Sequence, residues 1–212
     1  MKKFELTSEF VTNIFGVKLF RIRALIEFGR VKAGDKGGFV EKEENLSQDG
    51  NAWVSGNAEV FGNAWVSGNA WVSGNAKVFG NAWVYGNAEV SGNAWVSGNA
   101  WVSGNAEVSG NAEVSGNAEV FGNANYAMVK GFGRKYRNTT FFRCKDGKIR
   151  VACGCFFGDL DEFREKVKET HGDGKMAKEY LAIADLMEMH FCEEKDRYGG
   201  ITTRRVEGEN EY

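Results

Sequence analysis

Proline is absent from this chain of 212 residues, and histidine occurs only twice, at His171 and His190. All four cysteines lie after residue 140, and no run of apolar residues is long enough to span a membrane. The first residues also lack the apolar segment of a secretion signal. We therefore expect a cytoplasmic protein with no membrane span, whose thiols are reduced.

An excess of one charge is also lacking, because 27 basic residues nearly balance 29 acidic ones and the net charge is −2. Such a balance gives no reason to expect nucleic acid or another highly charged partner. Glycine is abundant, with 28 residues, and glycine-rich sequence is compatible with a flexible chain. Here the glycines recur at a fixed interval, which indicates ordered structure instead.

The tripeptide Gly-Asn-Ala occurs thirteen times at a spacing of six residues, from Gly50 to Gly122. Twelve of these units read Gly-Asn-Ala-x-Val-y, where y is Ser, Phe or Tyr. In an extended backbone, alternation places Ala and Val on one side and x and y on the other. Gly and Asn both tolerate a left-handed turn. A unit this short must stack on copies of itself, with Ala and Val inside and the Asn side chains in ladders.

This unit resembles the hexapeptide repeat, in which an aliphatic residue and a small residue four places later, such as Val54 and Ala58, recur along the chain. The resemblance covers residues 50–124 and implies a mainly β fold, a left-handed parallel β-helix with three units to each triangular coil. The chain is also similar to uncharacterised prophage-borne proteins with Gly-Asn-Ala-x-Val arrays, including the segment 31–40 before the array. These likenesses imply a bacterial host cell and carry no known activity.

Three units per coil place residues 18 apart above one another, so the x positions form three outer columns. All six tryptophans occupy x positions, and we expect none of them in the interior. The third column contains Trp65, Trp83 and Trp101, with Tyr85 and Phe121 at neighbouring y positions. An exposed aromatic strip of this kind is typical of an interface. We expect a homo-oligomer, with the trimer of many hexapeptide-repeat proteins as its favoured form.

Other interpretations of this aromatic strip remain open. Aromatic ladders can simply stabilise parallel strands through cross-strand contact. The strip can also serve as a platform for a small ligand or glycan, or as a seat for helices that follow the array.

The hexapeptide-repeat family is best known for acyltransferases, which use a histidine general base and often a loop extruded from the helix. Residues 50–124 contain no histidine and no inserted loop, and the carbonic-anhydrase branch needs three zinc-binding histidines. General base catalysis requires a group that titrates near neutral pH. We therefore predict no catalytic residue and no cofactor. The alternative is an acyltransferase-like enzyme whose site lies outside the array and uses His171 or His190.

The segments on either side of the array have different characters. Residues 1–49 are expected to form an N-terminal cap and a first imperfect coil over residues 31–46. Alternation of Phe20, Ile22 and Ala24 predicts a strand in this cap. The array with its end covers residues 50–127.

Residues 128–198 are expected to form a small α+β module. Strands over 139–144 and 149–153 are joined by a four-residue turn and predict a hairpin. Asp159 and Glu162 are placed as the N-terminal capping pair of a helix that Gly172 ends, and Asp173 is expected to open a second helix. The charged residues 199–212 are predicted to be a mobile tail.

Basic residues are interspersed with aromatic ones between Lys130 and Arg150. This composition occurs in surfaces that bind anions or nucleic acid. The candidates for such a patch are Arg134, Lys135, Arg137 and Arg143. The same composition describes an amphipathic hairpin with solvated basic side chains, which we favour, so nucleic acid is not an expected partner.

The cysteines raise the question of a metal site. Cys153 and Cys155, with Cys144 across the hairpin and His190 or Cys192, have the donor types of a zinc site. One Cys-x-Cys pair without a second close pair is a weak signal, and buried inert thiols are commoner. We predict no metal.

Taken together, these features favour a non-enzymatic oligomeric scaffold or binding protein. It would be a phage or prophage accessory protein that presents its C-terminal module, or a groove between subunits, to a host protein or small ligand.

Overall fold

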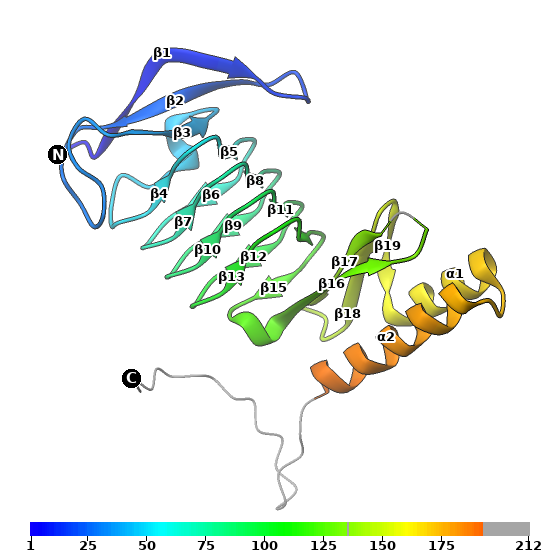
Figure 1. The fold of residues 1–212 in the computed structure, drawn as a ribbon. Helices are drawn as coiled ribbons and strands as arrows, with labels where there is room; N and C mark the ends of the chain where they lie inside the picture. Colours follow the sequence, from blue (N-terminus) through cyan, green and yellow to red (C-terminus); the bar gives the residue numbers. More distant parts are fainter. Residues whose placement is uncertain (135, 193–212) are drawn as a thin grey trace, which may run out of the picture.

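The computed structural model describes residues 1–134 and 136–192 of the chain. It contains a parallel β-helix, with an antiparallel hairpin over its first coils and an α+β module at its far end (Figure 1). The expected mainly β fold, with a parallel β-helix and a C-terminal α+β module, is confirmed. Lys135 and the tail 199–212 lie outside the described residues.

The N-terminal cap is built from β1 (Phe4–Thr12), β2 (Lys18–Ala24) and β3 (Lys36–Val40). These three strands pair antiparallel, and β3 then pairs parallel with the first coil, with Val40 opposite Val60. A 3-10 helix (Glu43–Asn45) follows, and a bridge from Leu46 to Val66 completes the imperfect coil. The strand expected at Phe20, Ile22 and Ala24 is present as β2, in which Ile22 and Ala24 are buried.

Each six-residue unit contributes one strand of two residues. The twelve strands are β4 (Trp53–Val54), β5 (Glu59–Val60), β6 (Trp65–Val66), β7 (Trp71–Val72), β8 (Lys77–Val78), β9 (Trp83–Val84), β10 (Glu89–Val90), β11 (Trp95–Val96), β12 (Trp101–Val102), β13 (Glu107–Val108), β14 (Glu113–Val114) and β15 (Glu119–Val120). They form three sheets, one for each face of the β-helix. The first face contains β4, β7, β10 and β13, and the third contains β6, β9, β12 and β15. The second face contains β5, β8, β11 and β14 and continues into the N-terminal cap.

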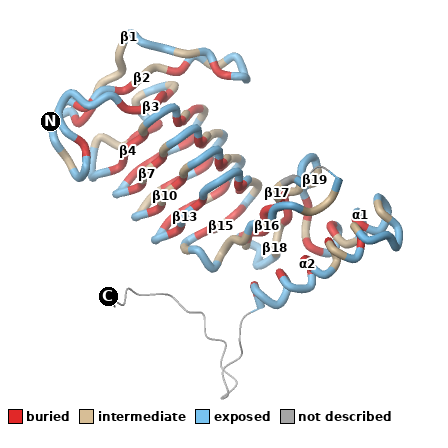
Figure 2. The backbone as a smooth tube through the Cα atoms, in the orientation of Figure 1, coloured by how far each residue is buried: buried red, intermediate tan, exposed pale blue. Residues whose placement is uncertain are grey.

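The interior of the β-helix is filled by the Ala and Val of every unit. From Ala52 to Val120, each of these Ala and Val residues is at most 1% exposed. In Figure 2 this interior appears as a buried line along each coil, with the exposed turns at the corners. The repeat glycines from Gly50 to Gly116 have φ between 61° and 73°, and a Cβ on Gly98 would lie 2.8 Å from the nitrogen of Gly116 in the next coil. Glycine therefore lets successive corners approach closely.

The expected asparagine ladders are present along all three corners. In one of them, the amide of Asn51 donates to Asn69 at 3.0 Å, and Asn69 donates to Asn87 at 3.0 Å. Nine such bonds, between 2.9 and 3.4 Å long, join asparagines 18 residues apart. Each asparagine in the middle of a ladder both donates and accepts, so the ladders hold successive coils in one register.

The C-terminal module has four antiparallel strands and two helices. They are β16 (Tyr126–Phe132), β17 (Arg137–Arg143), β18 (Ile149–Cys153), β19 (Phe156–Asp159), α1 (Leu160–His171) and α2 (Lys175–Phe191), preceded by a 3-10 helix (Asn123–Asn125). The expected hairpin is formed by β17 and β18, with Arg143 opposite Ile149. Asp159 and Glu162 form the expected reciprocal capping box, and Gly172 ends α1 with φ of 55°.

One boundary differs from expectation, because α2 is capped by Gly174 and the expectation that Asp173 opens it was wrong. Gly172 and Asp173 are both used in the turn, and the backbone N–H of Gly174 donates to the carbonyl of His171 at 3.2 Å. The helix therefore starts one residue later, without a side-chain cap.

The module closes the open end of the β-helix. Cys144 bridges Ala118 of the last coil, and the Lys145 N–H donates to the carbonyl of Asn117 at 3.2 Å. The Thr140 hydroxyl accepts from the N–H of Glu113 at 3.1 Å. Phe142 is fully buried and joins the interior cluster of the β-helix. Edge groups that would otherwise be unpaired are thereby satisfied at this end.

Candidate functional site

The start of the first face is covered by the N-terminal cap. Trp53 is only 2% exposed and lies between the rings of Phe4 and Phe28, at centroid distances of 6.5 and 5.4 Å. Trp53 occupies an outward position as expected, in register with Trp71, but the cap buries it. The cap folds back over the first coil, and a Cβ on Gly37 would lie 2.7 Å from the Trp53 ring. A glycine inside β3 was the sequence signal for this close approach.

Basic side chains of the N-terminal cap also contact the first face. The guanidinium of Arg30 lies 5.6 Å from the centroid of the Trp71 ring and pairs with Glu89 at 3.4 Å. The buried Lys3 ammonium donates to the carbonyl of Ala52 at 2.9 Å, and burial lowers the pKa of Lys3 to about 8.

The second face has an aromatic column that is covered by the turn of the β1–β2 hairpin. Phe61 and Phe79 stack at 5.0 Å with their planes 2° apart. The ring of Phe15 lies 5.7 and 5.5 Å from them and 6.2 Å from Trp95. Phe61 is 6% exposed as a result. Figure 1 shows the β1–β2 hairpin running along this side of the coils.

The third face has the aromatic strip predicted from the repeat, defined as Trp65, Trp83, Trp101, Tyr85 and Phe121. Trp65 and Trp83 meet edge to face, and Trp83 and Trp101 stack, both pairs at 5.5 Å. Trp65 is 37% exposed, Trp83 41% and Phe121 49%. The strip is therefore an ordered aromatic surface that is open to solvent.

Tyr85 is half-buried within the strip. Ser67 and Ser103, one coil before and one coil after it, are both buried. This burial indicates that the aromatic side chains pack down against the sheet instead of extending into solvent.

The module contributes one contact to the strip. The Lys145 ammonium lies 3.0 Å from the centroid of the Trp101 ring, and the same group is 4.0 Å from Glu119. Trp65 and Trp83 stay exposed with both helices in place, and Figure 1 places α1 and α2 beyond the last coil. The helices are therefore not seated on the strip.

The residues of the candidate anion patch have different structural settings. Arg134 is exposed, whereas the guanidinium of Arg143 donates to the carbonyl of Phe191 at the end of α2. Arg137 lies in β17, and Lys135 is outside the described residues.

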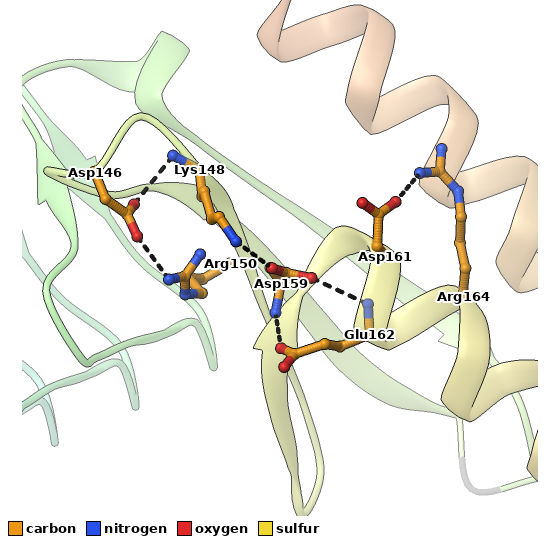
Figure 3. Close-up of polar contacts among 7 residues, drawn as sticks. All are labelled: Asp146, Lys148, Arg150, Asp159, Asp161, Glu162 and Arg164. Atoms are coloured by element: carbon orange, nitrogen blue, oxygen red, sulfur yellow. Dashed lines mark hydrogen bonds and ion pairs between the residues drawn. The ribbon is translucent and has the colours of Figure 1, made fainter.

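Basic residues of the β17–β18 turn have acidic partners (Figure 3). Lys148 pairs with Asp159 at 2.9 Å and Arg150 pairs with Asp146 at 2.7 Å. The pKa of the Asp159 carboxyl is lowered by the N–H of Glu162 and then by Lys148. These cations stabilise the module itself.

A cavity of about 270 Å³ lies in the module, between the sheet and the two helices. It is lined by Phe132, Gly133, Arg134, Cys153, Cys155, Phe156, Phe163, Lys166, Val167, Thr170, His171 and Tyr180. The sequence singled out several of these residues separately, but only the fold brings them together. They come from four segments of the chain, and no regular spacing in the sequence links these segments.

The cysteines are separated by their surroundings. Cys144 is buried, which raises the pKa of its thiol to about 11. The sulfur of Cys153 lies 3.1 Å from the Thr139 hydroxyl, which donates to it. Within residues 1–134 and 136–192, no three His, Cys, Asp or Glu side chains are grouped in a way that would hold a metal ion. His190 is exposed and packs against the ring of Phe191 at 4.9 Å.

Fold and surface together define a parallel β-solenoid protein with both ends capped. A family model described as a YdcK beta solenoid repeat matches residues 88–104, which supports a relation to repeat β-solenoid proteins. No curated protein matches the chain. Neither helix in the described part of the chain is long and apolar enough to cross a membrane.

Proposed function

We propose that this protein is a non-enzymatic scaffold that self-associates through the aromatic strip of its third face. One observation carries the proposal: within residues 1–134 and 136–192, the aromatic repeat residues of the other two faces are buried or half-buried, whereas Trp65, Trp83 and Phe121 of this strip are exposed. Phe15 lies over the second-face column, and Trp53 on the first face is 2% exposed. On the third face, Trp83 keeps 41% of its surface exposed.

The strip has enough apolar surface to hold copies of the chain together. A tryptophan side chain buries up to about 250 Å², so covering two-fifths of it removes roughly 100 Å² from water. At about 25 cal/mol per Å², each such tryptophan would contribute roughly 2.5 kcal/mol before the cost of association. Trp65 and Trp83 are both exposed to about this degree, and Phe121 adds further apolar surface to the contact.

A second copy is the occupant that the geometry favours. The strip is straight and repetitive, and every copy of the chain presents the same strip, so identical surfaces can meet in one register. The proposed assembly is a trimer, as in the hexapeptide-repeat proteins that the array resembles. In such an assembly the C-terminal modules remain at one end, where they would meet a host protein or small ligand in a bacterial cytoplasm. An accessory role for a phage or prophage product is consistent with this arrangement.

Sedimentation velocity tests the proposal, with wild-type protein compared across a range of micromolar concentrations. Wild type should sediment as an oligomer. Trp83→Glu should sediment as a monomer with an unchanged circular dichroism spectrum, because it places a charge in the centre of the contact. Trp83→Phe, which keeps an aromatic ring, and Glu107→Lys, on the first face, should both remain oligomeric. A wild type that is monomeric at tens of micromolar would contradict the proposal.

A further inference from the structure

The cavity of the C-terminal module lies outside the β-helix and plays no part in the proposed self-association. One wall comes from the end of β16, another from the β18–β19 turn, and the remainder from α1 and the first turns of α2. Its volume is about 270 Å³, which suits a small molecule.

The floor of the cavity is a packed aromatic cluster. Phe163 is 3% exposed and makes ring contacts with Phe156 at 5.5 Å and with Tyr180 at 5.8 Å. Val167 is also buried, and the His171 ring stacks on Tyr180 at 6.0 Å with the planes 21° apart. These side chains support one another, so the floor is already formed without a ligand.

Gly133 brings the end of β16 against this floor. Its φ is +70°, and a Cβ at this position would lie 2.3 Å from the hydroxyl oxygen of Tyr180. Only glycine fits such a conformation at such a distance. The next residue, Arg134, is exposed and also lines the cavity.

The edge of the cavity has basic side chains. Arg134, Lys166 and His171 line the cavity, and within residues 1–134 and 136–192 no acidic residue lines it. Glu169 pairs with the Lys166 ammonium at 2.8 Å, which leaves further N–H groups of that ammonium able to donate. An apolar floor below a cationic edge complements a ligand with an apolar body and one negative charge.

We propose that this cavity binds a small carboxylate with an apolar body, of the size of an aryl-alkanoic or medium-chain fatty acid. The body lies on Phe156, Phe163 and Tyr180, and the carboxylate accepts hydrogen bonds from Arg134 and Lys166. The proposal does not depend on self-association, because none of these residues belongs to the strip.

Isothermal titration calorimetry on the full chain tests the proposal with two acids, 4-phenylbutyrate and octanoate. Each acid has a neutral control of the same shape, 4-phenylbutanamide and octanamide. The acids should bind with saturation, and the amides at least about tenfold more weakly, a difference of about 1.4 kcal/mol. Equal binding of acid and amide would overturn the charge argument, and no binding at millimolar concentrations would overturn the site.

Variants locate the binding. Arg134→Gln and Lys166→Gln should each weaken the acids severalfold and leave the amides unchanged. Lys178→Gln is the matched control, because Lys178 is exposed on α2 and does not line the cavity. Acid binding that is equally strong in all three variants would place the ligand elsewhere.

Alkylation of Cys155 measures binding independently of calorimetry. Cys155 lines the cavity, so a bound acid should slow its alkylation, measured peptide by peptide with mass spectrometry, and leave the alkylation of Cys192 unchanged. Equal rates at Cys155 with and without a saturating acid would contradict occupancy of this cavity.

Discussion

The second and third faces of the β-helix are made from the same repeat, yet one is covered and the other is open. Both have aromatic residues at outward positions: Phe61, Phe79 and Trp95 on the second face, and the five residues of the strip on the third. On the second face, Phe61 is 6% exposed under Phe15. On the third face, Trp65 and Trp83 are 37% and 41% exposed.

The repeat itself cannot explain this difference, because its inward residues are equally buried on both faces. The difference comes from the N-terminal segment, whose β1–β2 hairpin extends the sheet of the second face and folds its turn over that column. The repeat thus decides which side chains point outward, and the flanking segments decide which of those side chains the chain covers itself.

The largest expected effect concerns the inward positions, where the two faces should be alike. Val78 belongs to the second face and Val84 to the third, and both are fully buried. Val78→Asp and Val84→Asp should each lower the free energy of unfolding by more than about 3 kcal/mol, because each buries an unpaired carboxylate. Chemical denaturation measures both.

Glu107→Lys is the control for this pair, because residue 107 points outward, and it should change stability by less than about 0.5 kcal/mol. If Val84→Asp were as mild as this control, the third face would not pack inward as described.

Replacing Phe15 should convert the covered face into an open one. Phe15→Ala removes the ring that contacts Phe61, Phe79 and Trp95. It should lower the free energy of unfolding by about 1–2 kcal/mol, since Phe15 itself is only partly buried. The fluorescence emission of Trp95 should shift to longer wavelength because its ring loses the contact with Phe15. The shift is measured in a variant in which Trp95 is the only tryptophan at an outward position.

Ile14→Ala is the neighbouring control, because Ile14 is 74% exposed in the same turn. It should leave stability and emission nearly unchanged. Identical results for the two variants would show that Phe15 does not cover the second face.

Much of this architecture could be predicted from the sequence, because the repeat encodes it locally. Alternation identified Val84 and its equivalents as inward, and the spacing of 18 residues identified the asparagine ladders. The capping pair of α1, Asp159 and Glu162, was predictable because it lies within one helical turn.

Burial of outward residues by segments far away in the sequence could not be predicted in the same way. Phe15 is a single aromatic residue in a turn, and nothing in its neighbours indicates that it packs 46 residues away on Phe61. Trp53 has the same local sequence as the exposed tryptophans, and only the fold of the cap buries it. The cavity was missed for the same reason, because Gly133 and Tyr180 meet only in the folded module.

The smallest expected effect concerns the module end of the third face. Lys145→Gln removes the ammonium above the Trp101 ring and its weak pairing with Glu119. It should lower the free energy of unfolding by about 0.5–1 kcal/mol, the usual range for a cation over an exposed aromatic ring. Thermal denaturation should detect this loss, whereas Lys130→Gln, also exposed, should show none.

Self-association, as proposed, requires that other copies of the chain cover the strip that residues 1–134 and 136–192 leave exposed. Hydroxyl-radical labelling of wild-type protein, read residue by residue with mass spectrometry, measures this directly at low and high protein concentration. Labelling of Trp65 and Trp83 should fall as concentration rises, while labelling of Phe10, which is 52% exposed on β1, stays constant. Labelling of Trp65 and Trp83 that is rapid at every concentration would contradict the claim.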